Sequence, residues 1–289
     1  MNIGMIGIDT SHCEIFARLL NDKNDPHYIK GARVTKAIPF YSPELPISAD
    51  RTVQLTEKVK MQYDVEMVED VAIFCEKLDG ILLTAVDGST HLEWIRKLAP
   101  YQIPIFIDKP ITFSSEDLRE IRELAETYQV PLMSSSSLRF AESFIDLKEA
   151  MKEPEMAYIY GPLPMQEGIP GYFWYGIHMV EMAVALMGTD IKHVQVDHYE
   201  TYELCHMTFK SGSQVIMRGE DEWHHYFGIV GHTSGNTFNA EIWKDEKPYY
   251  ASLLEKVIAF FQSRVSPVPW EETEAVVSII EKINIQRTV

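Results

Sequence analysis

Short apolar segments alternate with helical ones through the first half of the chain, and this alternation constrains the fold more than any other feature. Helices are expected between the apolar segments, for example over Arg51–Tyr63 and Glu116–Tyr128, where apolar residues recur with a helical period. The apolar segments themselves are expected to form strands, at Asn2–Ile8, Ala32–Ile38, Gly80–Val86, Ile103–Ile107 and Val130–Ser135. Strands that alternate with helices predict an α/β domain with a doubly wound parallel sheet.

The pattern changes near residue 138, and strands then dominate. After a helix at Glu142–Met151, five strands are expected at short spacing, at His193–Tyr199, Tyr202–Phe209, Gln214–Arg218, His225–Gly231 and Thr237–Trp243. This spacing predicts an α+β domain with a mainly antiparallel sheet, covered on one face by helices at Gly176–Leu186 and Tyr249–Ser263. We therefore expect two domains, residues 1–137 and residues 138–289, with the C-terminal helix free to pack back on the first.

The charge of the chain argues against two classes of partner. The 289 residues include 43 acidic and 26 basic side chains, which gives a formal net charge of −17. A field of this sign repels nucleic acid and anionic membrane surfaces. No apolar run approaches the ~20 residues of a membrane-spanning helix, and the apolar N-terminus is interpreted as a strand rather than a signal peptide.

The cysteines indicate a reducing environment. Cys13, Cys75 and Cys205 are widely separated and form neither a disulfide framework nor a Cys-x-x-Cys pair. All three stand among apolar residues, so we expect buried thiols and a cytoplasmic protein.

A lysine follows the strand at Ile103–Ile107 directly. The sequence there is Asp108-Lys109-Pro110, and Pro110 ends the ladder and holds Lys109 extended. Open α/β sheets bind ligands at the carboxyl ends of their strands, where a partly desolvated lysine is suited to proton transfer. The alternative is a surface ion pair between Lys109 and Asp108.

Four motifs in order resemble a known family. They are a glycine-containing strand–helix start, Asp108-Lys109-Pro110, Leu138-Arg139-Phe140, and Gly176-Ile177-His178 at the head of a helix. In this order and spacing, over essentially the whole chain, the sequence resembles the glucose–fructose oxidoreductase / inositol dehydrogenase family (Gfo/Idh/MocA).

The resemblance implies an N-terminal Rossmann domain that binds NAD or NADP. It also implies an oxidoreductase that transfers a hydride to or from a sugar-like or polyol substrate. It makes Lys109 and His178 the acid–base pair, and Arg139 and Trp174 are candidate substrate contacts. The open sheet of the second domain would form a homodimer or homotetramer. The candidate cofactor contacts are Gly7, Ile8, Asp9, Thr10, Ser11, His12, Thr84, Asp87, His91, Asp108 and Lys109.

The glycine-rich loop departs from the family pattern. Gly7 is the one glycine kept from Gly-x-Gly-x-x-Gly, and Asp9 and His12 stand at the other two positions. We expect Asp9 to face a bound diphosphate, and a Ser11/Glu14 capping box to occupy donors that phosphate would use. Pro39 stands where the family has an acid for the ribose. Weak dinucleotide binding is therefore expected.

Other departures leave alternatives open. Trp174 replaces the aspartate that precedes the family histidine by four residues. A non-redox enzyme on the same scaffold (a lyase, isomerase or hydrolase) or a non-catalytic sugar-binding sensor subunit would also explain the changes. The side chains of Asp9, His12, Asp87, His91 and Asp108 follow strand ends at one sheet edge. Helix capping and packing explain them better than a metal site, so we assign no metal ligand.

Overall fold

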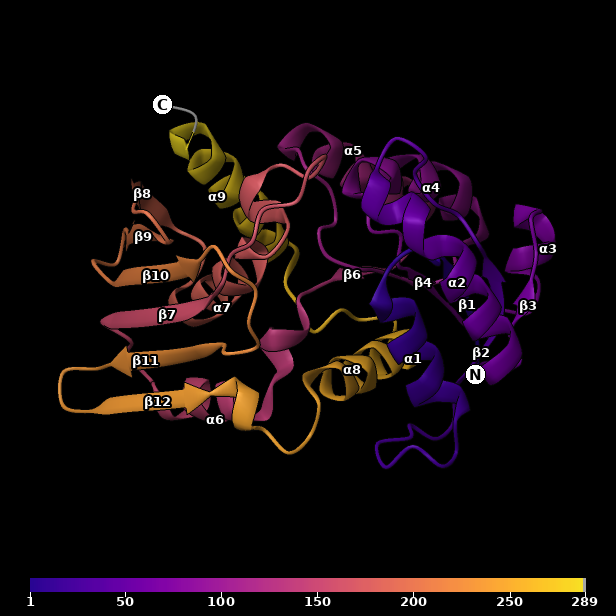
Figure 1. The fold of residues 1–289 in the computed structure, drawn as a ribbon, viewed down its shortest axis with the longest axis horizontal. Coiled ribbons are helices and arrows are strands. Elements are labelled where there is room, and N and C mark those ends of the chain that lie inside the picture. Colours follow the sequence, from indigo (N-terminus) through magenta and orange to yellow (C-terminus); the bar gives the residue numbers. More distant parts are fainter. Residues whose placement is uncertain (288–289) are drawn as a thin grey trace. The chain divides into compact units, whose positions relative to one another are not determined.

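The computed structural model describes residues 1–287, which form two compact units (Figure 1). The first unit comprises Met1–Ser135 and Leu254–Val268. The second comprises Ser136–Leu253 and the segment from Pro269 onward. The predicted fold class is confirmed, because the first unit contains a parallel sheet between helices and the second contains a mixed, mainly antiparallel sheet.

The first unit is built on a six-stranded sheet in which every pair is parallel. Its strands are β1 (Asn2–Ile6), β2 (Arg33–Ile38), β3 (Glu66–Met67), β4 (Gly80–Leu83), β5 (Ile105–Ile107) and β6 (Leu132–Ser134). They lie in the order β3-β2-β1-β4-β5-β6, so the strand order reverses between β1 and β4. This is the order of dinucleotide-binding sheets, whose ligands lie outside the carboxyl ends of the strands at the reversal.

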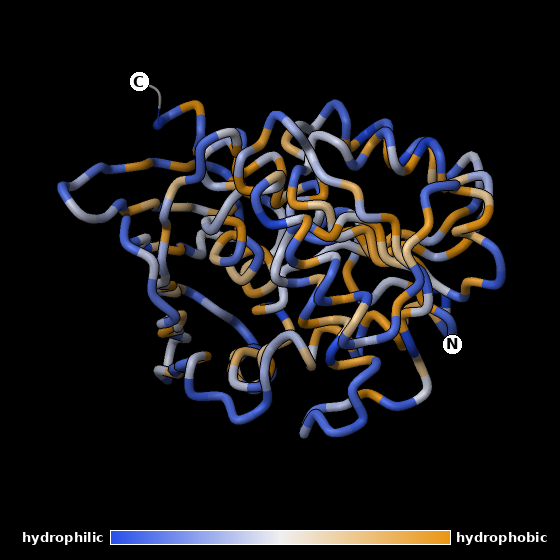
Figure 2. The backbone as a smooth tube through the Cα atoms, turned by 45° about the vertical axis from the view of Figure 1, so that its right-hand side comes forward, coloured by the Kyte–Doolittle hydropathy of each residue, from blue (hydrophilic) through white to orange (hydrophobic). Residues whose placement is uncertain are grey.

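Five helices surround this sheet. They are α1 (Ser11–Asn21), α2 (Pro46–Tyr63), α3 (Val71–Cys75), α4 (His91–Leu98) and α5 (Ser115–Tyr128). The strands β4 and β5 are buried along their whole length, as expected for strands covered on both faces. Figure 2 shows the same segregation, with hydrophobic residues gathered along the parallel strands.

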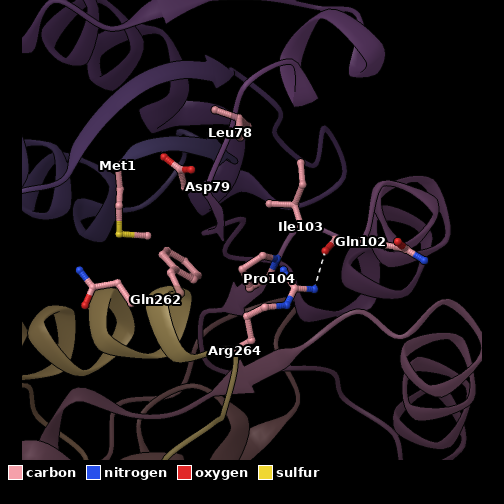
Figure 3. A pocket seen from close by; sticks show the side chains of 9 residues that line it. Met1, Leu78, Asp79, Gln102, Ile103, Pro104, Gln262 and Arg264 are labelled. Atoms are coloured by element: carbon pink, nitrogen blue, oxygen red, sulfur yellow. Dashed lines mark hydrogen bonds between the residues drawn. The ribbon is translucent and has the colours of Figure 1, made fainter.

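The chain returns to the first unit late in its course. Helix α8 (Tyr249–Ser263) leaves the second unit at Leu254, and the ring of Phe261 lies so close to Gly80 that a Cβ there would overlap it. Arg264 donates from Nη2 to the carbonyl oxygen of Gln102 at 2.9 Å, beside a surface cavity of about 450 Å³ at the amino ends of β1, β4 and β5 (Figure 3). The expectation that α8 covers the second sheet is therefore wrong from Leu254 onward.

The second sheet also has six strands. They are β7 (Met156–Pro162), β8 (Ile191–His198), β9 (Tyr202–Phe209), β10 (Gln214–Glu220), β11 (Gly228–His232) and β12 (Thr237–Glu241). Their order is β12-β11-β7-β10-β9-β8; β7 and β10 are parallel, and the other neighbours are antiparallel. A hairpin turn over residues 210–213 joins β9 to its antiparallel partner β10. The sequence reading missed β7, although it lies at the centre of the sheet.

The two faces of this sheet differ. Helices α6 (Glu142–Ala150), α7 (Gly176–Met187) and α9 (Trp270–Arg287) cover one face. Val215 and Met217 are fully buried on that face. The opposite face carries half-buried apolar side chains, including Tyr158, Leu204, Ile216 and Val230.

None of the helices formed by residues 1–287 combines the length and the apolar character that crossing a bilayer requires. Within the same residues, the three cysteines are buried free thiols, as predicted.

Candidate active site

The turn after β1 keeps the geometry of a nucleotide-binding loop. Gly7 has φ +90°, and a Cβ on it would overlap the backbone of Ala85 in the loop after β4. Only glycine fits such a close approach with a positive φ. Thr84 fixes the same turn, because its hydroxyl donates to the carbonyl oxygen of Gly7 at 2.7 Å. Ile8 is buried, and its backbone N–H donates to the carbonyl oxygen of Phe40 at 3.3 Å.

Helix α1 is capped by Thr10 rather than by the predicted box. The Thr10 hydroxyl accepts from the backbone N–H of His12 at 3.5 Å. Ser11 is exposed in the first turn, and Glu14 accepts from the hydroxyl of Tyr63 at 2.6 Å. The predicted Ser11/Glu14 capping box is therefore wrong, and Ser11 remains at the exposed start of the helix.

Asp9 is completely buried and serves as an acceptor inside the unit. Its carboxylate accepts from the Ser48 hydroxyl of α2 at 2.7 Å and from the backbone N–H of Val86 at 3.1 Å. Burial raises the pKa of Asp9 to about 6, although the hydrogen bonds from Ser48 and Val86 oppose this shift. The carboxylate points into the unit, so the expectation that it faces a bound diphosphate is wrong for this structure.

His12, Asp108 and Lys109 meet at the carboxyl end of β5, and all three are buried. His12 Nδ1 contacts Asp108 Oδ2, while Asp108 Oδ1 accepts from the backbone N–H of Lys109 at 2.8 Å. Burial acts to raise the pKa of Asp108, but the interactions with His12 and Lys109 together outweigh it and the net shift is downward. Lys109 is 9% exposed, which excludes the alternative of a lysine on the open surface.

The remaining candidates after β4 have local structural partners. Asp87 caps a short turn by accepting from the backbone N–H of Ser89 at 3.0 Å. His91 is fully buried, with Nδ1 at 3.0 Å from the carbonyl oxygen of Ile111 and Nε2 at 2.9 Å from that of Ala85. Burial lowers the pKa of His91. Residues 1–287 contain no group of three His, Cys, Asp or Glu side chains that could hold a metal ion.

His178 is placed in the second unit by a buried polar network. Its Nδ1 lies 2.6 Å from the Ser136 hydroxyl, and Ser136 donates its backbone N–H to Glu181 at 2.7 Å. Arg139 donates from Nε to the other Glu181 oxygen at 3.2 Å and also pairs with Glu272. Since the guanidinium is buried between two carboxylates, these contacts favour a structural role for Arg139.

Aromatic side chains adjoin His178. The rings of Tyr175 and His178 meet edge-on at 5.8 Å, and Trp174 meets Tyr175 at 5.5 Å. The sequence reading missed Trp223, whose ring N–H donates to the Tyr175 hydroxyl at 2.9 Å and whose side chain is 62% exposed. The signal available was the run of aromatic and imidazole residues from Trp223 to Phe227, in a segment assigned to a strand and to no site.

The first unit fits the diphosphate of a dinucleotide. The Gly7 turn is kept, the start of α1 carries the exposed Ser11, and the Asp9 carboxylate is turned inward. The end of the site that would hold the adenosine lacks an acidic residue for the ribose hydroxyls, because Pro39 and Phe40 follow β2. The Phe40 ring packs edge-on against Trp94, with 5.2 Å between the ring centres.

Comparisons with known proteins agree with this geometry. A family model described as "Oxidoreductase family, NAD-binding Rossmann fold" (Gfo/Idh/MocA) matches residues 1–136. The rhizopine catabolism protein MocA of Rhizobium meliloti is 26% identical over 84 residues. That alignment covers 29% of this chain and 26% of the curated relative, so it spans about a quarter of that protein.

Solved structures share the fold over the whole chain. A putative myo-inositol dehydrogenase from Sinorhizobium meliloti 1021 superposes with a TM-score of 0.80 and 16% identity, covering 100% of this chain and 98% of that one. A UDP-N-acetylglucosamine 3-dehydrogenase from Acidithiobacillus ferrooxidans gives 0.78 and 12%, covering 99% and 97%. An oxidoreductase from Agrobacterium radiobacter in complex with NAD⁺, L-tartaric acid and magnesium gives 0.75 and 13%, covering 97% and 94%.

At these identities the solved structures establish the fold, and the family model assigns residues 1–136 to the Rossmann domain of an oxidoreductase family. The prediction of an oxidoreductase-type enzyme is confirmed at the level of the family. The resemblance inferred from the motifs is confirmed as well: residues 1–136 match the model of the NAD-binding Rossmann domain of the Gfo/Idh/MocA oxidoreductase family, and the chain shares the fold of the solved dehydrogenases over its whole length.

Proposed function

We propose that the protein is an NAD- or NADP-dependent oxidoreductase that transfers a hydride to or from a sugar-like or polyol substrate. The observation that carries the proposal is Lys109, a buried lysine at the carboxyl end of β5 in a Rossmann domain that matches an NAD-binding family. Oxidation of a hydroxyl removes a proton as well as a hydride, and a positioned acid–base group must take that proton.

The bound dinucleotide would supply the hydride acceptor or donor. The loop from Gly7 to Ser11 and the start of α1 would hold its diphosphate. Lys109 would hydrogen-bond the reacting oxygen and exchange its proton, and His178 would assist. Ser136 and Glu181 hold His178 and its helix in place for this role.

The substrate contacts of the second unit would come mainly from aromatic side chains. Tyr175 links these side chains to His178: its ring contacts those of His178 and Trp174, and its hydroxyl accepts the hydrogen bond of Trp223. Aromatic faces suit the apolar face of a ring-shaped polyol. The exposed Asp221 and Glu222, which precede Trp223, disfavour substrates that carry a phosphate or carboxylate. Arg139 remains a weaker candidate because its charge is engaged with Glu181 and Glu272.

The proposal extends to assembly and location. The half-buried apolar face of the second sheet supports a homodimer or homotetramer. Three buried free thiols support a reducing compartment such as the cytoplasm.

The test is a nucleotide titration followed by a turnover screen. Purified protein is titrated with NADH and NADPH by fluorescence, and a panel of inositols and aldoses is then screened for absorbance change at 340 nm. Lys109→Ala should retain folding while turnover falls roughly 10²–10⁴-fold, the usual worth of a positioned acid–base group. Binding of neither nucleotide at millimolar concentration, or near-normal turnover by Lys109→Ala, would refute the proposal.

A further inference from the structure

Two departures from the family motifs contact each other. His12 stands at the third glycine position of the loop, and Asp108 stands where the Glu-Lys-Pro motif of the resembled family has its glutamate. These residues are 96 positions apart, yet His12 Nδ1 contacts Asp108 Oδ2 and both side chains are buried. The two replacements therefore belong to one contact, and we treat them together rather than as two independent departures from the family motifs.

Asp108 links His12 to Lys109. One carboxylate oxygen contacts the imidazole, and the other accepts the backbone N–H of Lys109 at 2.8 Å. The charge of Lys109 acts on the carboxylate too, and contributes to the lowered pKa of Asp108. The Asp108 carboxylate also acts on the buried His91 of α4: its charge and that of Asp87 partly oppose the lowering of the His91 pKa by burial.

We propose that His12 is a positioning residue that sets how readily Lys109 exchanges its proton, by holding the carboxylate of Asp108. The inference rests on the proposed acid–base role of Lys109. A carboxylate favours the charged form of a neighbouring ammonium group. When His12 donates a hydrogen bond to Asp108, less of that negative charge acts on Lys109, and Lys109 gives up its proton more easily.

The matched sizes of the two side chains support this reading. With glycine at position 12, the short Asp108 side chain would lose the donor that His12 supplies. With glutamate at position 108, an extra methylene would enter the space between the carboxylate and His12. Each family-like replacement, made on its own, should therefore disturb Lys109. The double variant His12→Gly/Asp108→Glu should restore the family arrangement, so its turnover should exceed that of either single variant.

The test measures Lys109 directly and needs no substrate. Lysines are methylated with ¹³C-formaldehyde and a borohydride reductant over a range of pH. The extent of Lys109 labelling is followed by mass spectrometry in His12→Phe, Asp108→Asn and the double variant His12→Phe/Asp108→Asn. The exposed Lys60 in the same samples serves as the control. His12→Phe should raise the pH midpoint of Lys109 labelling by about one unit, and Asp108→Asn should lower it.

The double variant distinguishes this mechanism from a general loss of structure. Without the Asp108 carboxylate, the route from His12 to Lys109 through that carboxylate is lost. Adding His12→Phe to Asp108→Asn should therefore shift the midpoint of Lys109 labelling much less than His12→Phe does alone. An unchanged midpoint in His12→Phe, or an equal shift in the Asp108→Asn background, would overturn the proposal.

Should His12→Phe fail to fold, the nearly isosteric Asp108→Asn carries the test, and an unchanged midpoint there overturns the proposal equally. Failure of the proposed function is seen separately, as normal turnover by Lys109→Ala.

Discussion

The buried carboxylate of Asp9 should make the stability of this protein depend on pH in the direction opposite to most carboxylates. Its pKa is raised from 3.8 to about 6 by burial. An acid with a raised folded-state pKa binds a proton more tightly when folded, so its protonated form favours the folded state. Stability is therefore gained as the pH falls through 6 and is fully developed below about 4, and it is lost again as the pH rises.

The size of the effect follows from the shift. About two pKa units at 1.36 kcal/mol each correspond to ~3 kcal/mol between the two limits, of which about 2 kcal/mol falls between pH 7.5 and pH 4.5. Asp9→Asn removes the titration and keeps an oxygen that can accept from the backbone N–H of Val86 and from Ser48. Wild type should therefore gain about 2 kcal/mol relative to Asp9→Asn on acidification over this range.

Urea unfolding of both proteins at the two pH values measures the difference, and titration of all other groups cancels in the comparison. Ser48→Ala serves as a matched control, because it removes one donor to Asp9 and should enlarge the pH dependence. A stability difference between wild type and Asp9→Asn that stays constant from pH 4.5 to 7.5 would show that Asp9 is not a buried titrating group.

Two further predictions concern the second unit. Arg139→Ala should lower the free energy of unfolding by roughly 3–5 kcal/mol, because it leaves Glu181 and Glu272 without their cation. Glu272→Gln, at the more exposed end of the network, should lower it less. Equal losses of stability in urea unfolding would contradict the network. Ile216→Asp, on the half-buried face of the sheet, should dissociate the oligomer without unfolding the protein, as measured by light scattering. Lys192→Asp, on the edge strand β8, should leave the oligomer intact. A monomeric wild type at micromolar concentration would remove the basis of this prediction.

The Rossmann domain could be predicted from sequence because its strands are buried on both faces. Such strands appear as continuous apolar runs, as at Ile105–Ile107, and Pro110 marks where the run must stop. Lys109 could be placed at the sheet edge for the same reason. β7 was missed because its burial alternates between Tyr158, Ile159 and Tyr160 and it ends in Gly161-Pro162, a pair that usually indicates a loop.

The partners of the candidate site residues could not be predicted from local rules. Capping describes contacts within a few positions, and even there the cap is Thr10 rather than Ser11. Asp9 finds Ser48 and Val86 at separations of 39 and 77 residues, and His12 finds Asp108 at 96. These contacts form only in the folded unit, where the sheet brings the loops after β1, β4 and β5 and helix α2 together.

The late return of α8 has a consequence for how the protein is made. At roughly 5–20 residues per second, the ribosome needs about 7–27 s to proceed from Ser135 to Val268, and only then is Phe261 available to cover Gly80. During this interval the nascent parallel sheet has an apolar flank open to chaperones or to other chains. An expression fragment that ends at Ser135 would keep that flank open permanently, so we expect it to aggregate unless the segment Leu254–Val268 is supplied as a separate peptide.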